Sequence, residues 1–326
     1  MGVSASKVEK DFKDIGEEMP EKLIGIENKG STCYLNSVVQ SLFHTNEFRE
    51  RILNSPLPPQ NTFLRSTYDL FQSIVSFKKT SGTISVASFI KHVKTLNELF
   101  NNDYHHDSHE FLIWALSTLD EDLKRIGTSW IEEIFAGKSV TQTTCLCCES
   151  KSTREEMFMD LGLEIMQNCS LVSSLNSFSK SERLKAADKF FCDNCNCKQE
   201  ADRITLIKKL PKILICHLKR FKYSENERKY TKLNYRVAFP SQLRLDNTTE
   251  ECENKLYELY AVIVHLGPGF QVGHYMSIVK IKKHWIRFDD DFIERTDENL
   301  IQFIFGSPKE IGSYPCGYIL FYRLVD

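Results

Sequence analysis

A cysteine at the start of a predicted helix, Cys33, is the first candidate for chemistry in this sequence. Apolar residues at helical spacing predict the helix, namely Leu35, Val38, Val39, Leu42 and Phe43. Ser31 or Thr32 can cap it, which puts Cys33 in the first turn, about 160° from the centre of the apolar stripe. A thiol there feels the positive end of the helix dipole, which favours the nucleophilic thiolate. An inert, partly buried cysteine is the alternative.

Asn28 lies just ahead of this cysteine, and Gly30 between them allows a tight turn into the helix. A side-chain amide beside a nucleophile can donate a hydrogen bond to a developing oxyanion. Asn and Gly before a helix are also ordinary turn residues, so the pattern is compatible with a plain turn as well.

A histidine in a predicted hairpin, His274, is the candidate base. Two predicted strands, 274–281 and 284–289, are joined by a tight turn at the two lysines between them. Folding about that turn brings His274 opposite consecutive aspartates, as in the base and orienting carboxylate of a catalytic triad. A surface hairpin with a polar pair is the alternative. A one-residue slip reverses the side-chain faces, so the pattern cannot choose among Asp289, Asp290 and Asp291.

Two C-x-x-C pairs indicate a metal site. Four thiolates presented by two tight turns are typical of a structural zinc ion. The favoured ligands are Cys145, Cys148, Cys192 and Cys195. Cys147 and Cys197 provide C-x-C alternatives on each side.

Composition limits the class of protein. The 326 residues carry 42 Lys and Arg against 44 Asp and Glu, a net charge of −2, which argues against a nucleic-acid binder. No apolar run approaches the roughly 18 residues of a membrane span, and the first residues lack the apolar core of a signal peptide. We therefore expect a cytoplasmic or nuclear protein whose eleven cysteines stay reduced.

Membrane contact is expected only if Gly2 is myristoylated. Gly2 followed by Ser6 fits the pattern M-G-x-x-x-S, although so short a pattern also arises by chance. A single acyl chain would give marginal, reversible binding.

Helical periodicity dominates up to about residue 124, and strand patterns follow. The predicted strands are 138–144, 204–210, 213–222, 257–266, 274–281, 284–289 and 318–324. Helices in the first part of the sequence and strands in the rest indicate an α+β protein. Residues 1–20 are polar, and we expect them to form a flexible arm.

Several motifs together resemble the ubiquitin-specific protease family of cysteine deubiquitinases. The motifs are the cysteine segment 28–37, HDSHEF at 106–111, LKRF at 218–221, and the histidine segments 273–275 and 288–291. They occur in the family's order, and the similarity runs from about residue 22 to 324. One departure is His106, where family members usually carry Gln.

The resemblance implies a papain-like cysteine protease with a right-hand architecture in a single catalytic domain, 21–326. A thumb would cover about 21–125, zinc-bearing fingers about 135–235, and a palm mainly 205–326.

The resemblance also implies roles for individual residues. The catalytic set would be Cys33 as nucleophile, His274 as base, Asp289 as orienting carboxylate, Asn28 as oxyanion donor, and Asp290 as assistant or substitute. Substrate contacts would come from Asp107 and Glu110, which would face the basic tail of ubiquitin, and from Tyr275. Zinc would hold the fingers and take no part in the chemistry.

The expected activity is hydrolysis of the (iso)peptide bond after the C-terminal glycine of ubiquitin, with ubiquitin and ubiquitinated proteins as partners. Residues 209–240 resemble the small branch of the family that WD40-repeat proteins activate. A catalytically silent ubiquitin-binding scaffold and a zinc-ribbon nucleic-acid binder are the alternatives. A glycine-rich loop at 266–273 also fits an enzyme that is nearly inactive until a partner binds.

Overall fold

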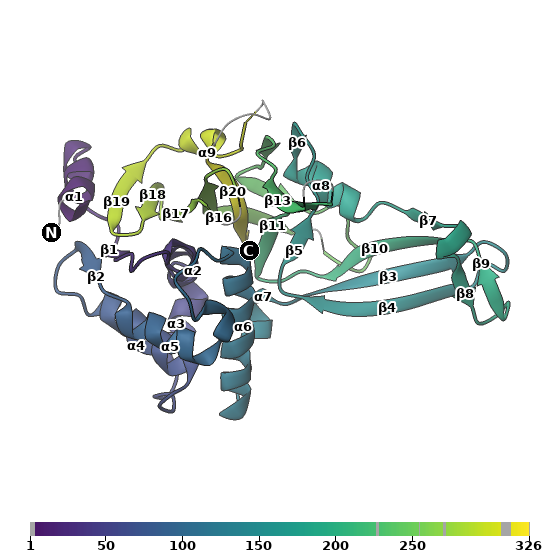
Figure 1. Ribbon diagram of the computed structural model, residues 1–326, viewed down its shortest axis with the longest axis horizontal. Helices are drawn as coiled ribbons and strands as arrows, with labels where there is room; N and C mark the ends of the chain where they lie inside the picture. The colour runs from purple at the N-terminus through teal and green to yellow at the C-terminus, as the bar shows by residue number, and fades with distance from the viewer. Residues whose placement is uncertain (1–3, 226–227, 254, 270–271, 308–313, 326) are drawn as a thin grey trace.

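The computed structural model describes residues 4–225, 228–253, 255–269, 272–307 and 314–325. Gly2, the possible acylation site, lies outside these residues. A group of helices packs below a central sheet, and a long, narrow sheet projects to one side (Figure 1). The predicted α+β class is confirmed, and we use the names thumb, palm and fingers for the three parts.

The thumb is helical because its apolar residues recur every three to four positions. In one of its helices the buried residues are Phe63, Leu64, Thr67, Leu70, Phe71 and Ile74. Its elements are β1 (Leu23–Ile26), α2 (Cys33–Phe43), α3 (Asn46–Asn54), α4 (Phe63–Val75), β2 (Ser81–Ile84), α5 (Ala87–Leu96), η1 (Glu98–Phe100), α6 (Ser108–Arg125) and α7 (Ile131–Phe135). Within the described residues, no helix is long and apolar enough to cross a lipid bilayer.

The palm is an eight-stranded sheet in the order β19-β18-β17-β16-β20-β11-β5, with β15 paired to β16. Its strands are β5 (Leu161–Leu163), β11 (Ile213–Leu218), β15 (Gln242–Arg244), β16 (Leu256–Leu266), β17 (His274–Ile281), β18 (His284–Asp289), β19 (Phe292–Thr296) and β20 (Cys316–Val325). The pairing of β5 with β11 is parallel, and the other pairings are antiparallel.

Both faces of the palm sheet are buried. Ile213 and Ile215 join the core shared with the thumb, whereas Leu214 and Cys216 join a second core on the opposite face. Successive side chains of a strand point to opposite faces, so an uninterrupted apolar strand can serve two cores. Smaller elements cover the second core or edge the sheet: β6 (Cys169–Ser170), α8 (Leu171–Phe178), β12 (Phe221–Ser224), β13 (Lys229–Lys232), β14 (Val237–Ala238) and α9 (Leu300–Phe303).

The fingers are a four-stranded sheet with a small hairpin at its far end (Figure 1). They comprise β3 (Gly137–Cys145), β4 (Lys151–Phe158), β7 (Glu182–Leu184), η2 (Ala186–Asp188), β8 (Phe190–Cys192), β9 (Cys197–Gln199) and β10 (Ala201–Lys209). All residues of β4 up to Met157 are exposed. This sheet therefore lacks the covered faces of the palm.

The chain before residue 20 differs from the expected arm. Residues Ser4–Asp14 form helix α1, which packs against β19 and β2. Val8 and Phe12 are fully buried, and Lys7 pairs with Glu294. The spacing of these two apolar residues, i and i+4, puts them on one helical face, and a segment with one apolar face can fold against the body of the protein.

Candidate active site and metal centre

Cys33 begins α2, the thumb helix that packs against α6 on one side and against β16 and β17 of the palm on the other. Every residue of α2 is buried, and Cys33 is 1% exposed. The sequence pattern placed Cys33 away from the apolar stripe, but the helix is enclosed on all sides, so position relative to the stripe does not decide burial here. Thr32 is the residue before the helix, and its side chain makes no capping hydrogen bond.

The histidine of the hairpin meets both Cys33 and a carboxylate. His274 Nε2 lies 2.5 Å from Asp289 Oδ1, and Cys33 is close enough to the same imidazole to raise its pKa. Strands β17 and β18 have the predicted bounds, and Ile281 pairs with His284 across the turn. The arrangement of thiol, imidazole and carboxylate is therefore assembled in the folded chain.

The pKa values of this pair reflect their mutual attraction. The hydrogen bond with Asp289, followed by the hydrogen bond with Cys33, raises the pKa of His274 to about 10. Burial acts to raise the pKa of Asp289, but the hydrogen bond and charge of His274 outweigh it and leave that pKa below its ordinary value. An ionised carboxylate beside a protonated imidazole is the expected state at neutral pH.

The second aspartate has different partners. Asp290 accepts hydrogen bonds from Asn28 Nδ2 at 2.7 Å and from Asn36 Nδ2 at 2.8 Å. Its backbone φ of 54° is left-handed, so the chain turns here between β18 and β19. Burial raises the pKa of Asp290, although the two amide hydrogen bonds oppose this. The turn directs Asp289 to the histidine and Asp290 to the amides, a division that strand register alone does not give.

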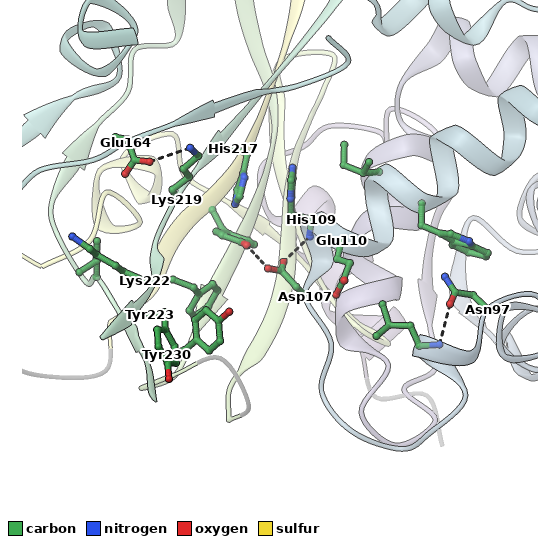
Figure 2. Close-up of a pocket in the computed structure, with 16 residues that line it drawn as sticks. Asn97, Asp107, His109, Glu110, Glu164, His217, Lys219, Lys222, Tyr223 and Tyr230 are labelled. Atoms are coloured by element: carbon green, nitrogen blue, oxygen red, sulfur yellow. Dashed lines mark hydrogen bonds and ion pairs between the residues drawn. The ribbon is translucent and has the colours of Figure 1, made fainter. Parts of the chain in front are cut away.

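A cavity of about 950 Å³ lies between the thumb and the edge of the palm near α6 (Figure 2). Asp107 and Glu110 at the start of α6 line it, together with His109 and His217 (Figure 2). Opposite them are Tyr223 and Tyr230 of the β12–β13 hairpin. The cavity thus joins acidic and aromatic side chains from both parts of the molecule.

The two carboxyl groups of this cavity differ in exposure. Asp107 is the N-cap of α6, accepts a hydrogen bond from the Tyr318 hydroxyl at 2.6 Å, and is half-buried, whereas Glu110 is exposed. Burial raises the pKa of both groups, and the charge of Asp107 adds to the effect on Glu110. Glu110 is therefore the carboxylate that an incoming cation can reach most directly.

Tyr275 is placed differently from the expected substrate contact. It is 1% exposed, and its ring packs against His265 and Tyr318 with centroid distances of 4.7 and 6.1 Å. Side chains alternate along β17, so the neighbour of the half-exposed His274 points into the core. In this conformation Tyr275 supports the wall behind the site.

Two buried cations near the site had no role in the sequence analysis. Lys232 Nζ donates to the carbonyl oxygens of His265 and Gly267, each at 3.0 Å, at the end of β16 just before the loop that leads to His274. Burial lowers the pKa of Lys232 to about 8. Arg220 is fully buried and also donates to main-chain carbonyls, including Gly317 O at 2.6 Å. Arg220 belongs to the LKRF motif and Lys232 to the segment 209–240, but neither motif indicated that these side chains bind main-chain carbonyls.

The four predicted metal ligands meet at the end of the fingers. The thiols of Cys145, Cys148, Cys192 and Cys195 all lie within 4.8 Å of one another. Cys148 Sγ is 3.6 Å from Cys192 Sγ. Among the described residues, Cys147 and Cys197 are both exposed and outside this group, which favours the C-x-x-C pairs over the C-x-C alternatives.

The chemistry of this cluster suits zinc. Hydrogen bonds, first from Asn194 and then from Ser150, lower the pKa of Cys148 to about 5. Hydrogen bonding to Cys148 instead raises the pKa of Cys195. Thiolates crowded together in this way repel one another unless a cation is bound, and four sulfur ligands select zinc or iron. The residues therefore fit a tetrahedral zinc ion.

Comparison with known proteins identifies the family. The model of the ubiquitin carboxyl-terminal hydrolase family matches residues 24–322. The chain is 41% identical to ubiquitin carboxyl-terminal hydrolase 4 of Arabidopsis thaliana, covering 99% of both chains. It is 40% identical to ubiquitin carboxyl-terminal hydrolase 12 of Salmo salar, covering 100% of this chain and 96% of the relative.

A solved structure shares the fold. It is described as the SAGA Ubp8/Sgf11/Sus1/Sgf73 DUB module bound to ubiquitin aldehyde, and it matches with a TM-score of 0.79 at 22% identity. The match covers 95% of this chain and 71% of the other. The chain therefore belongs to the ubiquitin carboxyl-terminal hydrolase family and is a cysteine-type deubiquitinase of the ubiquitin-specific protease group.

Proposed function

We propose that Cys33, His274 and Asp289 form the catalytic triad that hydrolyses the (iso)peptide bond after the C-terminal glycine of ubiquitin. The observation that carries this proposal is the 2.5 Å contact of His274 with Asp289, on an imidazole whose pKa Cys33 also raises. The Cys33 thiolate attacks the carbonyl carbon and forms a thioester as the C–N bond breaks. His274 gives its proton to the departing amine and then takes one from the water that releases ubiquitin.

Asn28 stabilises the oxyanion in this proposal, and Asp290 positions Asn28. An amide nitrogen carries two hydrogens. Asp290 accepts one of them from Asn28 at 2.7 Å, which leaves the other to donate to the oxyanion. Asn36 holds the second oxygen of Asp290 and so fixes the carboxylate in place. Asp290 is therefore a positioning residue in this proposal, and its hydrogen bonds go to the amides and not to the histidine.

The cavity beside α6 receives the C-terminal tail of ubiquitin in this proposal. Asp107 and Glu110 supply negative charge for the basic tail, and Glu110 is the more accessible of the two. Tyr223 and Tyr230 provide an exposed aromatic surface on the opposite side. Their rings lie 5.3 Å apart, which makes one continuous apolar patch for the tail to cover.

Zinc bound by the four cysteines has a structural role in this proposal. The cluster lies at the far end of the fingers, and the triad lies where α2 meets the palm (Figure 1). Cys145 and Cys148 at the end of β3 and Cys192 and Cys195 of the β8–β9 hairpin would hold the ion, and so would link these two segments. Four cysteine ligands leave no open position for a substrate, as is typical of structural zinc.

A WD40-repeat protein is the proposed activator. Support comes from the resemblance of residues 209–240 to the branch of the family that such proteins activate. These residues include the β12–β13 hairpin and Lys232, which bonds to the loop before His274. A partner that fixes this hairpin has a direct route to the catalytic histidine.

Turnover of a fluorogenic ubiquitin conjugate tests the proposal, with wild type and Cys33→Ser each measured with and without a WD40 protein. We expect turnover by the wild type only, and a higher rate with the activator. Full activity of the wild type alone would contradict the activation step. Failure of a ubiquitin-based electrophile to label Cys33 under any condition would instead favour the silent scaffold.

A further inference from the structure

A second cluster of metal-binding side chains lies beside the cavity of Figure 2 and plays no part in the proposed reaction. It consists of His109 on α6, His217 on β11, and Asp160 just before β5. One ligand atom from each residue lies within 4.8 Å of the other two. The two imidazole rings are stacked with centroids 3.7 Å apart and planes 16° from parallel (Figure 2).

The hydrogen bonds of this cluster leave one buried nitrogen without a partner among the described residues. His109 Nε2 lies 2.8 Å from Asp160 Oδ2, which satisfies that pair. His217 Nε2 is buried and has no hydrogen-bond partner within the described part of the chain. This buried nitrogen without a partner is the observation that singles out the cluster.

Two imidazoles and one carboxylate form a ligand set for a particular class of ion. Such a set suits Zn²⁺ and similar transition ions, whereas Mg²⁺ and Ca²⁺ prefer oxygen ligands. Donor atoms around a tetrahedral zinc ion lie about 3.3 Å apart, given bonds of roughly 2 Å. The contact between His109 and Asp160 is already closer than this. An imidazole binds a metal through the lone pair in its ring plane, so His217 must turn out of its stack with His109 to complete the set. The nearby cation Lys219 is paired with Glu164 at 3.0 Å.

We propose that His109, Asp160 and His217 bind a divalent zinc ion whose fourth position faces the cavity, and that the bound ion opposes entry of the ubiquitin tail. Metal binding rests only on the three-residue cluster. Competition with the ubiquitin tail rests on the function proposed above for the cavity. An ion of charge +2 would offset the carboxylates of Asp107 and Glu110 and repel a basic tail.

Metal binding is tested without any need for activity. The full chain carrying Cys33→Ser, with its four-cysteine site already filled, is dialysed against micromolar Zn²⁺ and its bound zinc is counted. We expect one further equivalent. Asp160→Asn and His217→Gln should each weaken it at least about tenfold. His92→Gln changes a histidine on α5 that does not line the cavity, and it should leave binding unchanged.

The proposed site is wrong if the Cys33→Ser chain and its Asp160→Asn variant bind the additional zinc ion equally well. Asp160→Asn is nearly isosteric and its side chain is partly exposed, so it is expected to stay folded where His217→Gln does not. Thermal unfolding of each variant identifies any change that is merely structural.

Competition is tested next on the chain with Cys33 intact. We expect Zn²⁺ to raise KM for a fluorogenic ubiquitin conjugate, and Asp160→Asn to need at least about tenfold more Zn²⁺ for the same effect. Inhibition that is identical in both proteins would place the ion at the catalytic thiol and overturn the competition. Absence of any hydrolysis without added zinc would count against the proposed function, and the dialysis result would stand apart from it.

Discussion

The catalytic cleft and the fingers are stabilised in different ways. Cys33 lies on a helix in which every residue is buried, and His274 lies on a sheet that is covered on both faces. In the fingers, the exposed strand β4 and the hairpin β8–β9 bury few side chains. The reacting groups are thus positioned by a buried core, whereas the fingers have a less covered sheet and a cluster of four cysteines at their far end.

The energies of the two regions follow from this contrast. Each large apolar side chain buried in the core contributes about 1.5–3 kcal/mol. The ion pairs of the fingers, such as Arg183 with Asp202 and Arg203 with Glu182, are exposed and contribute about 1 kcal/mol or less each. We therefore expect a metal held by the cysteine cluster to contribute much of the stability at the far end of the fingers.

The largest effect is expected from Cys33→Ala. Removal of the nucleophile should lower kcat/KM for a ubiquitin conjugate at least about 10⁴-fold. The core around α2 should keep the free energy of unfolding within about 1 kcal/mol of the wild type, because only the sulfur is lost. Enzyme kinetics and urea unfolding measure the two quantities. A large loss of stability would mean that the thiol also holds the cleft together.

Asp289→Asn should have the next largest effect, lowering kcat about 10²- to 10⁴-fold. The aspartate is the first cause of the raised pKa of His274, so its loss should move that pKa down from about 10 toward its ordinary value. The alkaline limb of the kcat/KM profile should then shift to lower pH. Asp290→Asn is the matched control and should leave that limb in place, since Asp290 bonds to Asn28 and Asn36.

Loss of the metal should loosen the fingers and leave the structure of the catalytic cleft unchanged. Cys192→Ser should reduce bound zinc and raise KM for ubiquitin about tenfold or more, equal to about 1.4 kcal/mol of binding. Hydrogen exchange should increase in β3 and β10 but not in β17 and β18. Cys197→Ser, which changes an exposed cysteine outside the cluster, serves as the control. Faster exchange in β17 would show that the cleft depends on the fingers.

A pair of arginines compares the stability of the two regions directly, and the one in the fingers should give the smallest effect of all. Arg220→Met in the palm should cost about 3 kcal/mol or more, because it leaves buried carbonyl oxygens without their donor. Arg183→Met in the fingers should cost about 1 kcal/mol or less, although its pair with Asp202 has two contacts of 2.9 Å. Urea unfolding measures both. Equal costs would contradict the difference between the regions.

Local patterns predicted the parts of this fold that depend on neighbours in sequence. The bounds of β17 and β18 match the expected strands, and the cysteine pairs meet as expected. The choice between the aspartates required the left-handed turn at Asp290, which depends on packing against β1. The burial of Tyr275 and the docking of α1 likewise depend on contacts between distant segments, which spacing does not encode.

The position of β20 constrains how the protein can be made. This strand, the last of the described elements, pairs with β16 on one side and β11 on the other, in the interior of the palm sheet (Figure 1). During synthesis the ribosome must release residues 316–325 before the sheet can close. The helix that carries Cys33 leaves the ribosome much earlier, before the strand that carries His274 can take its place in the sheet. During synthesis the enzyme is therefore expected to stay inactive until residues 316–325 have joined the sheet.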